Sequence, residues 1–169
     1  MTGMGQHADV LAVIAEVAAA FVGFSLAIGL LQPDQAGAEL RKQAMHSVAE
    51  LAMVSGAGAL VVLVIQTFNL SAETTWRIGS ACTASLWAVT FYWATKRYSR
   101  TGKNWKKIDR IRYAGWLSFA GIGLLVFNAL FSTDIGGQLL ILGLFFALAI
   151  SAYLFLVATF LIESNENVV

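Results

Sequence analysis

Residues 96–112 read KRYSRTGKNWKKIDRIR and contain eight of the eleven Lys and Arg residues in the chain. The sequence on either side of this stretch is strongly apolar. Short clusters of Lys and Arg between apolar segments mark cytoplasmic loops of membrane proteins. The sequence therefore predicts a membrane protein in which residues 96–112 form a basic cytoplasmic loop.

The composition of the whole chain agrees with a membrane location. Hydrophobic residues make up 58% of the 169 residues and charged residues only 12%, and the mean hydropathy is +0.71. A soluble domain needs a more polar surface than this. The net charge is +1, and the basic residues lie beside apolar spans, so we expect them to contact lipid headgroups and expect no nucleic-acid partner.

Five apolar stretches have the length of a membrane crossing, about 20 residues for a hydrocarbon layer of about 30 Å. The predicted fold is all-α, a single transmembrane domain with its N-terminus outside and its C-terminus in the cytoplasm. This topology places ten of the eleven basic residues inside and leaves Arg77 outside. The predicted spans are residues 9–31, 44–68, 77–95, 113–131 and 138–162.

Glu16 is the strongest functional candidate, because a carboxylate inside an apolar span is costly to expose to lipid. At 100° per residue it shares a helix face with small residues, including Gly23 and Ala27. Small residues let helices approach closely in lipid, so we expect this face to pack against other helices. Two interpretations stay open: a proton- or cation-interacting site, or a protonated or hydrogen-bonded glutamate that fixes the helix register.

His46 and Glu50 form a second polar pair, four residues apart near the cytoplasmic end of the second span. With Glu16 they make up a predicted ion or proton pathway, although the three residues are equally compatible with separate roles. A metal ion would need further ligands beside this pair. The sequence therefore predicts no metal site, and an interfacial pair accessible to water is the simpler interpretation.

Small residues at helical spacing in the other spans predict close helix packing. These residues fold the bundle or bring copies of the chain together, and we expect the chain to self-associate. Asn128 is expected to form a hydrogen bond between helices. The predicted packing residues are Gly23, Ala27, Gly56, Ala84, Gly121, Asn128, Gly143 and Ala147.

Part of the basic loop is predicted to lie on the anionic inner leaflet, because apolar residues recur at helical spacing among its positive charges. Binding of single-stranded nucleic acid through Trp105 is the less favoured alternative, since the loop lies between two spans. The residues predicted to contact the membrane surface are Arg97, Arg100, Lys103, Trp105, Lys106, Lys107, Arg110 and Arg112.

Several specific activities lack their motifs. The sequence has no His-Glu-x-x-His zinc motif, no Gly-x-Ser-x-Gly elbow and no lysine inside a predicted span. Its two histidines fall on opposite sides of the membrane in the predicted topology, so one chain offers no bis-histidine haem site. The sequence therefore predicts a protein that is not an enzyme, and it assigns no cofactor.

The run AEVAAAFVGFS at residues 15–25, with Trp76 and Arg77, resembles a widespread set of small uncharacterised bacterial polytopic inner-membrane proteins. This resemblance implies the bacterial inner membrane and no activity.

Two functions are expected from the sequence. The first is a homo-oligomeric, channel-like or proton- or cation-linked transport protein. In it, Glu16 faces a pathway entered from outside, and Glu50 and His46 lie near the inner mouth. The alternative is an accessory or scaffolding subunit of a larger membrane complex, in which the small-residue stripes are docking surfaces and the chain has no transport of its own.

Overall fold

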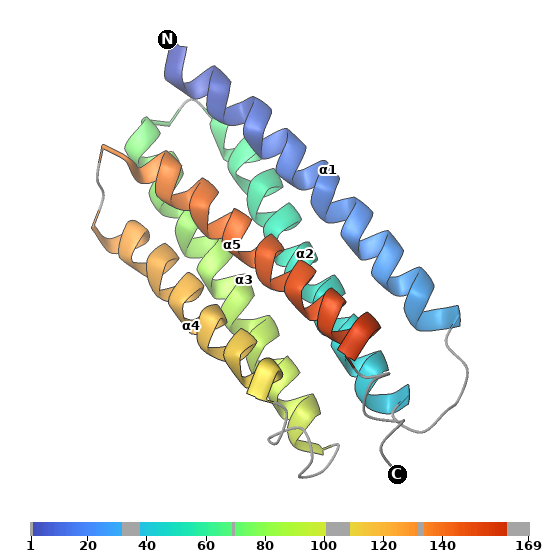
Figure 1. Cartoon of the computed structure of the whole chain (residues 1–169). Helices are drawn as coiled ribbons and strands as arrows, with labels where there is room; N and C mark the ends of the chain where they lie inside the picture. Colours follow the sequence, from blue (N-terminus) through green and yellow to red (C-terminus); the bar gives the residue numbers. More distant parts are fainter. Residues whose placement is uncertain (1, 32–37, 69, 101–108, 132–133, 162–169) are drawn as a thin grey trace.

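The computed structural model describes residues 2–31, 38–68, 70–100, 109–131 and 134–161. This part of the chain forms five long α-helices in an up-and-down bundle (Figure 1). The last helix continues into a short π-helical segment. The bounds are α1 Thr2–Leu31, α2 Ala38–Gln66, α3 Ala72–Arg100, α4 Asp109–Leu130, α5 Gly136–Leu156 and η2 Val157–Leu161.

Four helices of the described chain are long and apolar enough to cross a membrane. The chain is therefore an all-α, multi-pass membrane protein, as the sequence predicts. α3 is long enough but less apolar than the other four, so its composition does not establish the fifth predicted span. The four apolar spans are His7–Gly29, Lys42–Gln66, Arg112–Leu130 and Gly136–Thr159.

The helices on both sides of the predicted basic loop extend into it. α3 continues to Arg100 and α4 begins at Asp109, so both ends of residues 96–112 are helical. The middle of this stretch, residues 101–108, lies outside the described residues. At its other end α3 begins beside Ser71, whose hydroxyl oxygen accepts a hydrogen bond from the Thr74 backbone N–H at 3.2 Å. This bond caps a helix N-terminus that would otherwise leave a donor unpaired.

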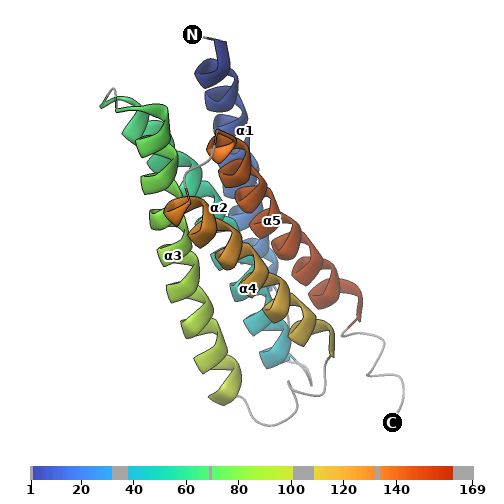
Figure 2. The same ribbon diagram turned by 90° about the vertical axis from the view of Figure 1, so that its left-hand side faces the viewer.

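The central helix of the bundle is α2. It contacts α1, α3 and α5, while α4 packs against α3 and α5. α1 lies at the edge of the bundle and packs mainly against α2 (Figures 1 and 2). One whole side of α1 is consequently uncovered by the described chain.

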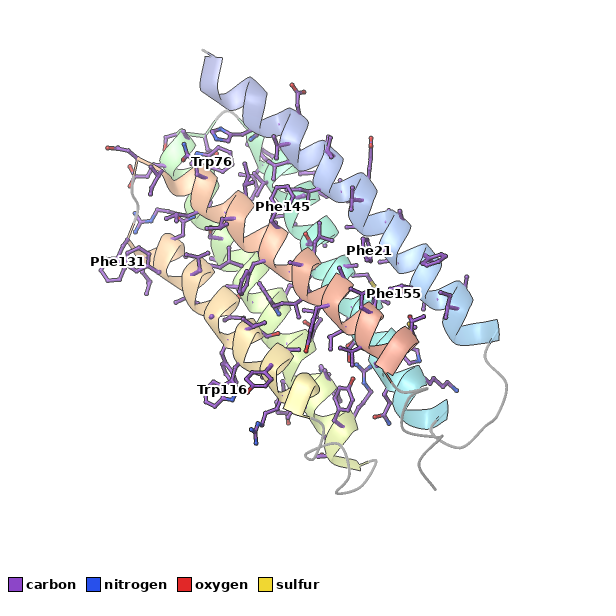
Figure 3. The ribbon with its side chains drawn as sticks, in the orientation of Figure 1. Phe21, Trp76, Trp116, Phe131, Phe145 and Phe155 are labelled. Carbon is purple, nitrogen blue, oxygen red and sulfur yellow. The ribbon has the colours of Figure 1, made fainter. Side chains whose placement is uncertain are left out.

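One end of the bundle collects basic residues. α1, α3 and α5 end there, and α2 and α4 begin there (Figure 1). We call it the basic end; its described basic side chains are Lys42, Lys96, Arg97 and Arg112. Exposed aromatic rings near it suit the headgroup level of a membrane, and Figure 3 shows Trp116 pointing away from the bundle. These exposed rings are Tyr92, Trp93, Tyr113 and Trp116.

Glycines allow α3, α4 and α5 to approach closely. A Cβ added to Gly121 on α4 would lie 2.3 Å from Cη2 of the buried Trp87 on α3. A Cβ added to Gly143 on α5 would lie 2.6 Å from a methyl carbon of Leu125 on α4. Both predicted packing glycines thus lie at helix contacts with no room for a side chain. Three further predicted packing residues are buried in the bundle: Gly56, Ala84 and Ala147.

Asn128 on α4 joins three helices through its buried side chain. Its amide nitrogen donates hydrogen bonds to Ser80 Oγ on α3 and to the carbonyl oxygen of Gly136 at the start of α5, both at 2.8 Å. The interhelical hydrogen bond expected of this residue is therefore present. Such bonds hold helix positions in lipid, where no water competes for the polar groups.

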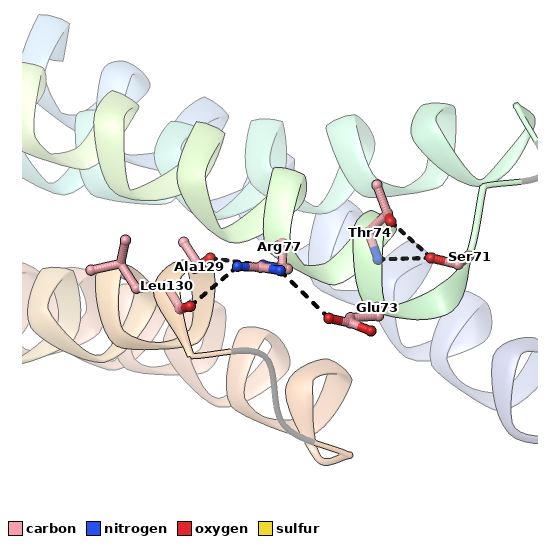
Figure 4. A network of polar contacts seen from close by, with 6 residues as sticks. All are labelled: Ser71, Glu73, Thr74, Arg77, Ala129 and Leu130. Atoms are coloured by element: carbon pink, nitrogen blue, oxygen red, sulfur yellow. Dashed lines mark hydrogen bonds and ion pairs between the residues drawn. The ribbon is translucent and has the colours of Figure 1, made fainter.

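Arg77 holds α3 against α4 at the end of the bundle opposite the basic end. Its Nε and Nη2 donate to the carbonyl oxygens of Ala129 at 3.1 Å and Leu130 at 3.2 Å (Figure 4). Glu73 lies 3.5 Å from Nη1 of the same guanidinium. A cation at a helix C-terminus satisfies carbonyl groups that lack intrahelical partners.

Candidate functional site

Glu16 lies on the uncovered side of α1. The residues that α1 buries are Leu11, Ile14, Ala18 and Ser25, and at 100° per residue they lie about opposite to Glu16. The small residues around Glu16 are all exposed, and an added Cβ at Gly23 would meet no atom within 4 Å. We call this surface the outer face of α1; it consists of Ala12, Glu16, Ala19, Ala20, Gly23 and Ala27.

The small-residue face was expected to pack against another helix, and the described chain does not show this packing. α1 packs on α2 through its opposite face, where the larger side chains of Leu11 and Ile14 are buried. Gly23 and Ala27 are both exposed in the described chain, and packing between chains stays a prediction.

The carboxylate of Glu16 lies deep within an apolar span. It is nine residues beyond His7, where the span begins, which corresponds to about 14 Å along the helix. A charged side chain at the middle of a membrane helix costs about 2.5–3.5 kcal/mol on insertion scales. An exposed carboxylate at this depth calls for a cover by another molecule.

Glu50 is paired with a residue of the neighbouring helix. It is half-buried on α2, and the Arg97 guanidinium on α3 donates a hydrogen bond to its carboxylate. This hydrogen bond raises the pKa of Arg97 above its ordinary value, so the guanidinium stays charged. The Glu50 side chain thus lies next to a fixed positive charge.

Tyr98 extends this polar cluster. Its side chain is 7% exposed, and its hydroxyl oxygen accepts a hydrogen bond from Ser47 Oγ on α2 at 3.3 Å. Burial raises the pKa of the Tyr98 phenol, which keeps the hydroxyl neutral. The two contacts together fix α3 to α2 at the basic end of the bundle.

A cavity of about 300 Å³ opens between α3 and α4 beside this cluster, and α2 and α5 contribute to its lining. The rings of Phe91 and Phe119 contribute to its apolar wall, with their centroids 4.8 Å apart. We call it the α3–α4 cavity. The polar side chains nearest the basic end in its lining are Ser47, Glu50, Tyr98 and Arg112.

His46 and Glu50 face different neighbours. His46 is exposed and borders a small hollow between α1 and α2 that Ser25 and Lys42 also line, whereas Glu50 lines the α3–α4 cavity. Glu16 borders neither space. The structure therefore does not join these three residues into one path, and in the described part of the chain no three His, Cys, Asp or Glu side chains lie close enough to hold a metal ion.

The residues predicted to contact the membrane surface lie in different places. Arg97 points to Glu50, and Arg112 is exposed at the α3–α4 cavity. Arg100 lies at the last turn of α3 and Arg110 at the first turn of α4. The other four lie outside the described residues: Lys103, Trp105, Lys106 and Lys107.

Arg97 lies in the predicted basic loop, so its pairing with Glu50 was not expected from the sequence. The sequence does contain a signal for this pairing, because helical side chains tilt towards the N-terminus of their helix. An arginine just past the cytoplasmic end of a span therefore turns back towards the bilayer if the helix continues. Ser47 and Tyr98 carried no comparable signal.

Comparisons with protein-family models, curated proteins and solved structures found no match. The resemblance of residues 15–25 to small bacterial membrane proteins stays a prediction. The described chain is a small helical membrane protein with four helices long and apolar enough to span a membrane.

Proposed function

We propose that the protein crosses its membrane five times, with α3 as the fifth crossing. α2 and α4 both begin at the basic end and run to the opposite end, so the chain has to return between them (Figure 1). α3 makes this return. Between Arg77 and Lys96 it has 18 residues without Asp, Glu, Lys or Arg, about 27 Å of helix, close to the thickness of the hydrocarbon layer.

The hydroxyl groups that lower the apolarity of α3 are compatible with lipid. Ser85, Thr90 and Thr95 each donate a hydrogen bond to the carbonyl oxygen four residues earlier in the same helix. A polar group that is bonded within its own helix costs less in lipid than an unpaired one. Composition alone therefore understates how well α3 suits a membrane.

The orientation follows from the basic end. Lys and Arg residues are retained on the cytoplasmic side, so the basic end faces the cytoplasm and Arg77 lies on the other side. α1 then begins outside, and α5 ends at the cytoplasmic surface. The cell inner membrane fits this arrangement and agrees with the bacterial resemblance.

The function that the geometry supports best is a homo-oligomeric transport protein for protons or cations. The observation that carries this proposal is the exposure of Glu16, deep in an apolar span, on the outer face of α1. Small residues around it allow the helix of a second copy to approach. Copies that meet through this face gather their carboxylates around one axis, as the acidic rings of cation pores do.

Replacement of Glu16 tests this function. The Glu16→Gln variant removes the charge and keeps the size of the side chain, so we expect loss of proton or cation flux into liposomes with an unchanged native mass. The native mass in nanodiscs is expected to be an integer multiple of 18.2 kDa. Glu73→Gln is the matched control, since Glu73 is exposed in the first turn of α3, outside the spans.

Flux that persists in Glu16→Gln at the level of the unmodified protein contradicts a pathway through this residue. A native complex that contains unrelated membrane proteins, with no flux from the chain alone, supports the accessory or scaffolding role instead.

A further inference from the structure

The α3–α4 cavity has a polar end and an apolar end. On α4 its lining runs from Arg112 at the basic end to Phe119, and on α3 from Tyr98 to Phe91 and Thr90. The Thr90 hydroxyl donates its hydrogen bond within α3. Arg112 and Phe119 are seven positions apart, as are Tyr98 and Phe91, which corresponds to about 10 Å along the helix. The cavity thus changes from charged to aromatic over the depth at which a lipid changes from headgroup to acyl chain.

The charges around the polar end favour an anion. Glu50 and Arg112 line the cavity, and Arg97 is ion paired with Glu50. These three described side chains therefore sum to +1. In the sequence, residues 96–112 contain eight Lys and Arg residues and a single carboxylate, Asp109. A cationic patch beside a membrane attracts anionic headgroups.

The apolar end is reachable from the lipid. Phe119 is 58% exposed, so the cavity extends to the outer surface of α4. Small residues leave the space open: an added Cβ at Gly115 would have only Phe91 Cε2 near it, at 4.0 Å. An empty apolar space forgoes dispersion contacts with its lining. An acyl chain that enters from the side supplies those contacts.

We propose that the α3–α4 cavity is a binding site for an anionic phospholipid of the leaflet at the basic end. One acyl chain lies against Phe91 and Phe119, and the phosphate lies beside Arg112. The Glu50–Arg97 pair borders the headgroup without adding net charge. This site is separate from Glu16 and does not depend on the proposed transport.

The experiment measures retention of defined lipids by native mass spectrometry. Purified, delipidated protein is incubated with phosphatidylglycerol, with phosphatidylcholine of the same chains, or with oleic acid. Phosphatidylglycerol carrying a photoreactive acyl chain then maps the site. We expect preferential retention of phosphatidylglycerol and photolabelling in the peptides that contain Phe91 and Phe119.

A matched pair of glycine variants on α4 separates the cavity from the general lipid surface. Gly115→Leu fills the cavity and displaces about two methylene groups of the acyl chain, so we expect about tenfold weaker retention. Gly123→Leu is the control, because an added Cβ at Gly123 meets no atom within 4 Å and the residue is exposed. We expect retention and photolabelling by this variant to match the unmodified protein.

A third variant, Arg112→Gln, removes the positive charge beside the proposed headgroup position. It is expected to reduce the preference for phosphatidylglycerol over phosphatidylcholine. Equal retention by Gly115→Leu and Gly123→Leu overturns the site. Equal retention of the two phospholipids by the unmodified protein overturns the selection by charge, and retention of oleic acid alone overturns the choice of a phospholipid.

Discussion

Asn128 shows how much one polar side chain contributes to the position of several helices. It is 1% exposed and donates to Ser80 on α3 and to Gly136 on α5. Hydrogen bonds between membrane helices contribute about 0.6 kcal/mol on average and about 1.7 kcal/mol at most. Because Asn128→Ala removes two of them, we expect it to lower the free energy of unfolding by about 1–3 kcal/mol, measured by denaturant unfolding in micelles.

Ser85→Ala is the control for this prediction. Ser85 is exposed and bonds only to the carbonyl oxygen of Ala81 in its own helix. We expect its removal to change the free energy of unfolding by less than about 0.5 kcal/mol. Similar losses in both variants would show that the contacts of Asn128 between helices add nothing.

Single residues differ in how far the sequence reveals their roles. An amide in an apolar span needs a hydrogen-bond partner, so a hydrogen bond from Asn128 was predictable. Its partner residues were not. Glu50 has the same need, but its partner Arg97 is 47 residues away. The residue pattern of α2 does not identify a partner so far away in the sequence. Only the packing of α2 on α3 brings the two side chains together.

At the scale of the helix, α1 shows that residue periodicity alone does not determine which face of a membrane helix is buried. Its sequence defines two faces, one of small residues with Glu16 and one with Leu11 and Ile14. In water the apolar face is the buried one, but in lipid both faces are apolar enough to be exposed. Periodicity therefore located the small-residue face correctly and did not determine that α1 packs on α2 through the opposite face.

The outer face of α1 gives a prediction for assembly. Gly23→Leu adds a large side chain where the described chain has open space, so the fold of one copy is expected to survive. A second copy docked there would clash with it, and we expect the native mass in nanodiscs to fall towards that of a single chain. Gly123→Leu on α4 provides an equally open position away from α1. If both variants keep the full oligomer mass, the interface lies elsewhere.

The positions of the four apolar spans were largely predictable from the sequence. The suitability of α3 for a membrane was not predictable from its composition. Apolar length placed the spans of α1, α2, α4 and α5 within a few residues. α3 has the length but carries Ser, Thr, Trp and Tyr, which hydropathy treats as polar. The hydrogen bonds of the hydroxyl groups within the helix and the burial of Trp87 against α4 depend on the fold, and composition does not contain them.

For the molecule as a whole, the number of crossings is tied to the direction of each helix. Four spans without α3 would leave α2 and α4 running the same way with no return between them. Five crossings remove this conflict and put Lys42, Arg97 and Arg112 on one side of the membrane and Arg77 on the other. The charge pattern and the order of the helices thus support the same topology independently.

Labelling of single cysteines at the two ends of α3 measures this topology directly. In a Cys82→Ser background, Glu73→Cys and Ser99→Cys each place one thiol at an exposed position, before and after the uncharged part of the helix. Because α3 is expected to cross the membrane, an impermeant maleimide added to intact cells should label the Glu73→Cys variant and should label Ser99→Cys only after permeabilisation. Labelling of both variants from the same side would leave α3 outside the bilayer and reduce the protein to four crossings.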